Sequence, residues 1–507
     1  MAGNRAIALN MIANTTSFVF AAAVSFFLTP YITNHVGIEA YGLVGLANSF
    51  ISYATLFTGA LNSMASRFII IEIHKKHYDE ANRYFSSVLI ANTIIALLLT
   101  IPSIWLILNL DRINVSDSLM WDAQLTFSII ILSFFVNLVG SFFGVVLYAK
   151  NILWKGSFRT VESGIFRIVL VLLLFSFFDT RIFYVALATF IAGIYPLIWN
   201  IRYTKTLIPE LKVSINSFSV KAIKVLTASG IWNSVTKLSQ ILNDGLDLLL
   251  CNLFIGGVMT GNVAIAKTLP SLFIGLIAVL SDSFYPSFLE YYSKKLLDEL
   301  SASINQSINL LSAVSGICLS ILIMYSRDFY RLWLPGEDEK LLSILTILAL
   351  GTVLISSCMY SLYSVFTLTN RVRTNSIVMV ISGLMSITIT IICLKTTDWG
   401  VYAIVGISSI VGIIRNLAFT PLYAAHCLKL PKLTFYKRIF LNLLNIALLL
   451  IVFNGIKYFM PINSWLLLLS NFLICGLIGI IVSWFVVFSK VQRQKFLQSI
   501  AIKLSRK

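Results

Sequence analysis

Stretches of about twenty apolar residues recur along almost the whole of this 507-residue chain. A helix needs about 20 residues, at 1.5 Å each, to cross a hydrocarbon layer ~30 Å thick. In lipid the backbone polar groups must be paired within the segment itself, which makes such stretches helices. Only 12% of the residues are charged, too few to cover a water-soluble protein of this length. The sequence therefore predicts an all-α polytopic membrane protein.

Glycine, proline, asparagine and charged residues divide the apolar stretches into about fourteen expected membrane helices. The first of them is too long for a signal peptide and ends without a small-residue cleavage site. The expected helices are residues 8–33, 41–65, 86–109, 124–148, 159–178, 182–201, 225–253, 261–287, 303–326, 341–368, 375–394, 399–427, 439–459 and 464–488.

The basic residues alternate from loop to loop. If the N-terminus is cytoplasmic, 27 of the 38 lysines and arginines fall in the termini and the even-numbered loops, which are then cytoplasmic. Lysine and arginine are retained on that side, so the pattern predicts a cytoplasmic (inner) membrane protein with both termini in the cytoplasm. The net charge of +17 is spread over these loops and forms no single patch, so no nucleic-acid partner is expected.

Two parts of the chain resemble each other at an offset of 219 residues. The offset aligns Asn14 with Asn233, Val36-Gly37 with Ile255-Gly256, Tyr41-Gly42 with Thr260-Gly261, Val44 with Val263, and Ala47 with Ala266. Both copies are a long helix, a tight turn containing glycine and a second helix. Glycine permits a positive φ and close backbone approach, so the match predicts a repeated geometry.

Six helices separate the two copies, so both have the same orientation and the repeat is parallel. We therefore expect an N-lobe over residues 1–201, a cytoplasmic linker over 202–224 and a C-lobe over 225–428, with a cavity between the lobes. Residues 429–507 are expected to add two further helices and a basic cytoplasmic tail.

Several short motifs carry a family resemblance. They are Val36-Gly37 followed by Tyr41-Gly42, Arg67-Phe68 at the end of the second helix, and Asn82-Arg83-Tyr84-Phe85-Ser86 before the third. With these motifs the chain resembles the Wzx-type polysaccharide-export flippases of the multidrug/oligosaccharidyl-lipid/polysaccharide (MOP) superfamily, to which the multidrug exporters called MATE also belong.

The resemblance implies two six-helix bundles that form a V and work by alternating access. It implies transport of a polyprenyl-diphosphate-linked oligosaccharide from the cytoplasmic to the outer leaflet, for O-antigen, capsule or exopolysaccharide assembly. The partners expected are that lipid, the bilayer and other polysaccharide-assembly membrane proteins. The first helix lacks the arginine that the similar peptidoglycan lipid flippases carry there, which favours another lipid-linked glycan.

Charged residues are rare in membrane helices and usually face a cavity or a partner. In a regular helix, residues spaced 3, 4 and 3 apart share one stripe. The expected seventh helix carries such a set, and the eighth carries Lys267 at a similar depth to Asp247. The set consists of Lys237, Gln240, Asp244 and Asp247.

Two interpretations of these charges stay open. In one, Lys237, Lys267 and Gln240 bind the diphosphate, with Asn48 as the N-lobe counterpart of Lys267, while Asp244 and Asp247 couple H⁺ or Na⁺. In the other, the charges form structural ion pairs between helices. Two arginines in other helices, Arg167 and Arg415, either line the cavity or reach to the membrane surface. No metal and no organic cofactor is expected.

Two other functions compete with a flippase. A cation-coupled multidrug exporter would need carboxylates and little positive charge in its cavity, which Asp244 and Asp247 suit and the two lysines do not. A membrane glycan polymerase or ligase would need a large external loop with activating residues. The longest expected external segments, residues 110–123 and 326–340, are short, and no nucleotide-binding motif occurs, so a transporter is favoured over an enzyme.

Overall fold

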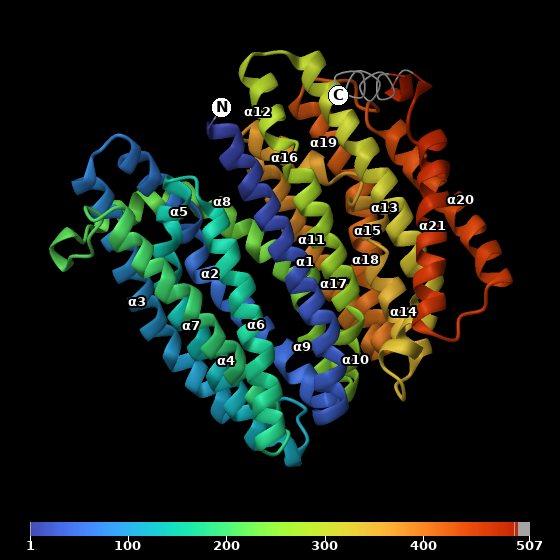
Figure 1. The fold of residues 1–507 in the computed structure, drawn as a ribbon, viewed down its shortest axis with the longest axis horizontal. Coiled ribbons are helices and arrows are strands. Elements are labelled where there is room, and N and C mark those ends of the chain that lie inside the picture. Colours follow the sequence, from blue (N-terminus) through green and yellow to red (C-terminus); the bar gives the residue numbers. More distant parts are fainter. Residues whose placement is uncertain (1, 491, 495–507) are drawn as a thin grey trace. The chain divides into compact units, whose positions relative to one another are not determined.

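The computed structural model describes residues 2–490 and 492–494, and their side chains except those of residues 2–8, 11 and 244. Regular structure in this range is helical, without strands (Figure 1). The predicted all-α class is therefore confirmed. The chain forms two compact units, Met1–Ala264 and Ile265–Lys507, and each is described by itself. Most of the predicted basic tail lies outside the described residues.

The first unit is built from long helices joined by short 3₁₀ turns. Its helices are α1 (Ala2–Val36), α2 (Ile38–His74), α3 (Tyr78–Leu108), α4 (Met120–Gly140), α5 (Val145–Ala149), α6 (Leu153–Phe177), α7 (Ile182–Leu207), α8 (Val220–Gln240), α9 (Asp247–Phe254) and α10 (Gly257–Ala266), of which α10 ends in the second unit. The 3₁₀ turns are η1 (Leu110–Arg112), η2 (Asp117–Leu119), η3 (Ser141–Gly144) and η4 (Ile215–Ser217), and a π-turn, η5, covers Ile241–Gly245.

The second unit is also helical, and α20 and α21 are the two helices predicted to follow the C-lobe. Its elements are α11 (Thr268–Asp282), α12 (Tyr285–Ser293), α13 (Leu297–Trp333), α14 (Glu339–Leu350), α15 (Val353–Ser356), α16 (Tyr360–Leu368), α17 (Val372–Thr396), α18 (Val401–Ala418), α19 (Thr420–Cys427), α20 (Tyr436–Phe459) and α21 (Trp465–Val486).

Twelve helical spans in the described part of the chain are long and apolar enough to cross a membrane. The two other expected helices, residues 225–253 and 341–368, are present but interrupted, the first by η5 and the second around α15. The second break contains glycine, threonine and serine, and hydrogen bonds between side chains and backbone join it to α18. Thr352 Oγ1 donates to the Ser409 carbonyl at 3.0 Å, and Ser409 Oγ donates to the Leu348 carbonyl. Such pairing makes a broken helix tolerable at membrane depth.

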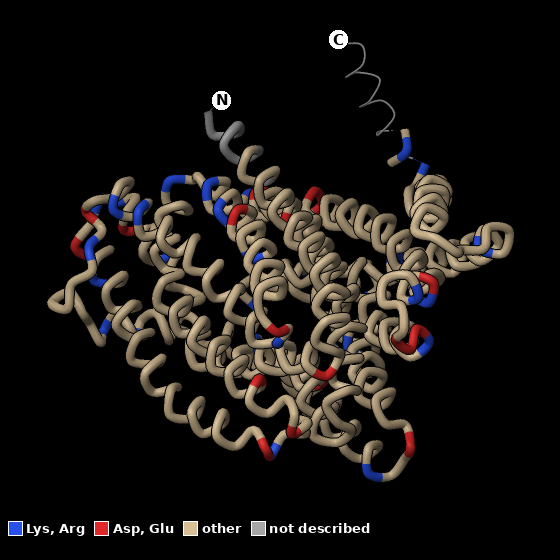
Figure 2. The backbone as a smooth tube through the Cα atoms, turned by 60° about the horizontal axis from the view of Figure 1, so that its bottom comes forward, with Lys and Arg blue, Asp and Glu red and all other residues tan. Residues whose placement is uncertain are grey.

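Large apolar side chains face outward from both units. Phe177 on α6 and Leu466 on α21 are each 77% exposed, a pattern that suits lipid and not water. Charged residues in each unit lie mainly at helix ends and in loops (Figure 2). The chain is therefore a multi-pass membrane protein.

The predicted repeat has a structural counterpart. Gly37 and Gly256, aligned by the offset of 219, both have positive φ, at 84° and 131°. Gly42 and Gly261, also aligned, lie against each other, since a Cβ on Gly42 would stand 2.7 Å from the Gly261 nitrogen. Small residues permit this close approach of α2 and α10.

The first unit continues beyond the linker at residues 202–224, because α8 packs along α2. The contact relies on small residues, and a Cβ on Gly230 would stand 1.9 Å from the Ala60 carbonyl oxygen. Close helix packing of this kind is common in membranes. Helix α8, the first helix of the predicted C-lobe, thus packs against the predicted N-lobe. The division into two lobes joined by a linker at residues 202–224 stays a prediction.

Candidate functional site

The first unit contains a cavity of about 370 Å³ between α2, α4, α6 and α7, which we call the Arg167 cavity. Its polar lining consists of Asn48, Ser133, Asn137, Arg167 and Thr189, and the remaining lining residues are apolar. Two residues predicted from the sequence, Asn48 and Arg167, thus lie around one cavity although 119 positions separate them. Arg167 is the charged residue among those that line it.

Arg167 projects from the middle of α6. Its Nε atom is buried without a hydrogen-bond partner, and no described carboxylate lies within ion-pair distance of its guanidinium. An arginine at the centre of a membrane helix costs about 2.5–3.5 kcal/mol on insertion scales. A structural ion pair would offset that cost, but the described side chains supply none, so the guanidinium retains donors for a ligand.

The polar neighbours of Arg167 keep part of their hydrogen-bonding capacity. Asn48 Nδ2 donates to the Val44 carbonyl at 2.9 Å, and Asn137 Nδ2 donates to the Ser133 carbonyl at 2.8 Å. An amide has two donors and an acceptor, so each asparagine can still offer an N–H and its oxygen. The cavity therefore combines one positive charge with neutral donors and acceptors.

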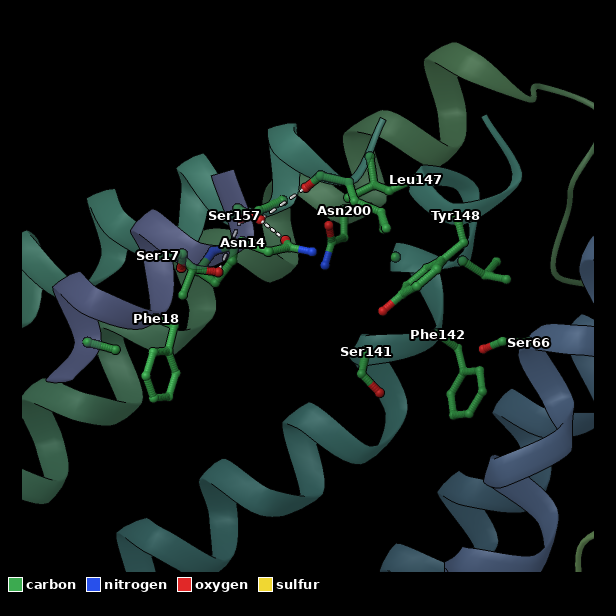
Figure 3. A pocket seen from close by; sticks show the side chains of 17 residues that line it. Asn14, Ser17, Phe18, Ser66, Ser141, Phe142, Leu147, Tyr148, Ser157 and Asn200 are labelled. Carbon is green, nitrogen blue, oxygen red and sulfur yellow. Dashed lines mark hydrogen bonds between the residues drawn. The ribbon is translucent and has the colours of Figure 1, made fainter. Parts of the chain in front are cut away.

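A second and larger cavity of about 650 Å³ opens in the same unit, where α1, α6 and α7 meet η3 and α5 (Figure 3). We call it the Asn14 cavity. Its polar lining is serine, threonine, asparagine and tyrosine, and no lysine, arginine, aspartate or glutamate is among its lining residues in the described part of the chain. Sequence reasoning did not identify this cavity.

Irregular helices shape the Asn14 cavity. Helix α4 ends at Gly140, and η3 carries the chain to α5. Pro196 lines the cavity from α7 and has no N–H for the carbonyl of Ala192, one turn before it. Ser163 Oγ on α6 donates to that carbonyl at 2.7 Å, which satisfies it. The break in α4 and the proline in α7 thus leave an open space, and α6 supplies the hydrogen bond that the proline cannot make.

A buried asparagine holds α1 against the start of α6. Asn10 Nδ2 donates to Asn151 Oδ1 at 2.8 Å, and Asn10 Oδ1 accepts from the Trp154 N–H at 2.9 Å. Asn151 has φ of 55°, a left-handed conformation that asparagine adopts more readily than most residues. One turn further along α1, Asn14 Oδ1 accepts a hydrogen bond from the Ser157 hydroxyl, which leaves the Asn14 amide N–H groups facing the cavity (Figure 3).

The polar stripe predicted over residues 237–247 is not a straight helical stripe. The π-turn η5 at Ile241–Gly245 adds residues to the turn, so Asp247 is rotated away from the register that regular helical spacing predicts. Lys237 is half-buried, Gln240 is exposed and Asp247 is 6% exposed. Tyr53 Oη donates to the Gly245 carbonyl at 2.7 Å, which satisfies backbone at the break. The Asp244 side chain lies outside the described part.

Lys267 and Arg415 belong to the second unit. Lys267 lies half-buried between α10 and α11, and its predicted pairing with Asp247 or Asp244 stays a prediction. Arg415, near the end of α18, is half-buried, and its Nη1 donates to Ser382 Oγ at 3.4 Å. Neither residue belongs to the Arg167 cavity or the Asn14 cavity.

Sequence reasoning missed most of the residues that line these cavities, among them Asn14, Asn137, Ser141, Tyr148 and Asn200. Amides are uncommon in lipid-facing positions, so an asparagine inside an apolar run was a usable signal. Serine and threonine gave little signal, because their hydroxyls can bond to carbonyls of their own helix, as Thr93 does with Leu89 at 2.9 Å.

The chain is similar in sequence to known proteins. Residues 7–292 match the family described as "Polysaccharide biosynthesis protein". Over 491 residues, 97% of each chain, it is 27% identical to the "Uncharacterized membrane protein EpsK" of Bacillus subtilis (strain 168).

Two solved structures show the same fold. A "Lipid II flippase MurJ, inward closed conformation" aligns with a TM-score of 0.69 at 19% identity, over 94% of this chain and 98% of its own. An inward-facing "multidrug resistance MATE family transporter of the MOP superfamily" aligns with a TM-score of 0.62 at 14% identity, over 83% and 98%. The resemblance drawn from the sequence is confirmed. The chain belongs to the polysaccharide biosynthesis protein family and has the fold of the MOP-superfamily transporters.

Proposed function

We propose that this protein is a flippase that moves a polyprenyl-diphosphate-linked oligosaccharide from the cytoplasmic to the outer leaflet of the cytoplasmic membrane, for assembly of O-antigen, capsule or exopolysaccharide. The observation that carries the proposal is Arg167, a guanidinium without a described carboxylate partner, in a cavity whose lining also offers neutral polar groups. The family match and the fold shared with a lipid II flippase support it.

The Arg167 cavity suits a diphosphate. A guanidinium presents paired N–H groups that match phosphate oxygens, and such charge-assisted hydrogen bonds are stronger than neutral ones. Asn48, Asn137 and Thr189 add neutral groups around the same space. In the proposed mechanism the polyprenyl tail stays in the bilayer while the head group is held in the cavity.

Transport proceeds by alternating access of the two lobes, residues 1–201 and 225–428. In this proposal both termini are cytoplasmic, and Lys237, Gln240, Lys267 and Arg415 face the path of the substrate. A potential that is positive outside assists outward movement of an anion by ~2.3 kcal/mol per charge per 100 mV. Voltage therefore contributes to the driving force, and Asp244 and Asp247 supply H⁺ or Na⁺ coupling.

A cation-coupled multidrug exporter is the second candidate, because the chain shares its fold with a MATE family transporter. The charge in the Arg167 cavity is positive, which repels the cationic substrates that such exporters carry. A glycan polymerase or ligase is a third candidate, but the segments between α3 and α4 and between α13 and α14 are short. A flippase accounts better for the charge and for the family.

The proposal is tested by glycan export in cells that lack the protein. The cells are complemented with wild type, Arg167→Gln or Arg167→Lys, and the lipid-linked intermediate is quantified on each leaflet. Removing one charge-assisted contact predicts a loss of about ten- to a hundredfold in export for Arg167→Gln. Arg167→Lys retains a point charge without the paired N–H groups, so we expect an intermediate loss.

Arg112→Gln is the matched control, because Arg112 is exposed in η1 and lies over the Trp105 ring at 5.6 Å, outside both cavities. We expect it to export normally. Accumulation of the intermediate on the inner leaflet in the null strain and in Arg167→Gln, at normal protein levels, supports the flippase. Normal glycan export in the null strain together with retention of cationic dyes would instead identify a drug exporter.

A further inference from the structure

The Asn14 cavity is offset from the Arg167 cavity along the same helices. On α6, Thr160 lines the first and Arg167 the second, and on α7, Pro196 lines the first and Thr189 the second. Each pair is seven residues apart, which is about two helical turns, or ~10 Å, on one helix face. A head group held at Arg167 would therefore have to extend by about 10 Å along these helices to enter the Asn14 cavity.

The lining of the Asn14 cavity defines the chemistry of its ligand. No described lining residue carries a charge, so an ionic group that gave up water on entering the cavity would gain no counter-charge. A purely apolar ligand would displace water from the amides and hydroxyls of the lining and leave them unpaired. A neutral, hydroxyl-rich molecule avoids both costs, because amides and hydroxyls each offer donors and acceptors.

Several polar side chains line this space and are not used elsewhere. Figure 3 shows the Tyr148 hydroxyl directed into the open space and the Asn200 amide beside Asn14 and Ser157, and Ser141 also lines the cavity. None of Ser141, Tyr148 and Asn200 makes a side-chain hydrogen bond to another described residue. Phe18 adds an aromatic surface to the lining. The volume of about 650 Å³ lies within the ~300–1,000 Å³ usual for ligand sites.

We propose that the Asn14 cavity holds uncharged sugars of the oligosaccharide next to its diphosphate, and that Asn14, Tyr148 and Asn200 select for them. The inference rests on the proposed flippase function and makes it more specific. It means that the sugars nearest the diphosphate carry no carboxylate, whatever charge the more distant sugars have. A uronic acid at that position would place an anion among groups that supply no counter-charge in the described lining.

The test uses the full-length protein in proteoliposomes and three labelled lipids: polyprenyl diphosphate with a neutral disaccharide, with a uronic acid as first sugar, and with no sugar. Wild type is expected to move the neutral glycolipid at least tenfold faster than the acidic one. Tyr148→Phe and Asn200→Ala are expected to slow the neutral glycolipid by about threefold to tenfold each, the effect of one hydrogen bond, and to leave the sugar-free lipid unchanged. Asn200→Lys is expected to shift the preference toward the acidic glycolipid.

Asn109→Ala is the matched control, because Asn109 caps α3 outside both cavities and its amide donates to the Trp105 carbonyl at 2.8 Å. Transport of the sugar-free lipid reports whether each variant is folded. If Asn200→Ala fails to fold, Tyr148→Phe, which removes a single oxygen atom, decides the test. Equal rates for the neutral and acidic glycolipids, with the cavity variants slowing neither, would overturn the sugar site while the flippase stands. Transport of none of the three lipids by wild type would overturn the flippase and the sugar site together.

Discussion

Gly230 lies where α8 crosses α2, and we expect Gly230→Ala to destabilise the protein. An added Cβ would stand 1.9 Å from the Ala60 carbonyl oxygen and 2.6 Å from Ser63 Oγ. Ser63 can turn away, but the carbonyl is backbone, so the two helices must part by about 1 Å and lose dispersion contacts along their crossing. Overpacking of this kind typically costs about 1–3 kcal/mol. Because backbone has to move, we expect a decrease in the free energy of unfolding of about 3 kcal/mol.

The assay is thermal unfolding of the purified protein in detergent, followed by the loss of the monodisperse peak in size-exclusion chromatography. Gly455→Ala is the control, because Gly455 lies within α20 and a Cβ there meets nothing within 4 Å. The same substitution at that site is expected to be neutral or to stabilise by up to ~1 kcal/mol through helix propensity. If Gly230→Ala melts at the temperature of wild type or above it, the close backbone contact between α8 and α2 is refuted.

Two further predictions concern buried polar groups in the first unit. Ser163→Ala should lower the free energy of unfolding by about 1–3 kcal/mol, because the Ala192 carbonyl is left unpaired. This loss should be smaller in a Pro196→Ala background, where residue 196 again has an N–H for that carbonyl. Equal losses in both backgrounds would contradict the reasoning. Asn252→Ala should cost about 2 kcal/mol, because Asn252 is fully buried and its side chain bonds the Asn114 N–H at 3.0 Å and the Asn114 carbonyl at 3.1 Å. An unchanged melting temperature for Asn252→Ala would show that the segment between α3 and α4 is not held there.

Hydrophobic runs predicted most of the fold, because lipid admits a backbone only if it pairs its own polar groups. The two expected helices that are interrupted carry glycine and polar residues at the break, such as Gly351 and Thr352. Hydropathy does not detect such breaks, since a side chain on another helix, here Ser409, donates to the Leu348 carbonyl next to the break. The repeat was predictable because a turn with positive φ favours glycine in both copies. Apolar residues in a membrane helix can replace one another more freely.

The candidate site was predictable only in part. The cost of a charge in lipid identified Arg167, and the repeat identified Asn48, which lines the same cavity. The predicted stripe over residues 237–247 assumed regular helical spacing, and η5 changes that spacing. The residues of the Asn14 cavity could not be selected, because their position depends on the break after Gly140 and on Pro196, which the sequence alone does not place opposite each other.

The contact between the repeats also shows what one fused chain can do that two identical half-length chains could not. At the offset of 219, Gly45 corresponds to Ala264, and a Cβ on Gly45 would stand 3.3 Å from the Ala264 Cβ, closer than side chains normally pack. Two identical half-length chains paired through this contact would carry the same residue on both sides, either two glycines or two crowded alanines. A chain in which both copies are fused can keep glycine on one side and gain a methyl group on the other. The pair of Gly45 and Ala264 is thus an asymmetric contact that a symmetric dimer of one half-length chain could not form.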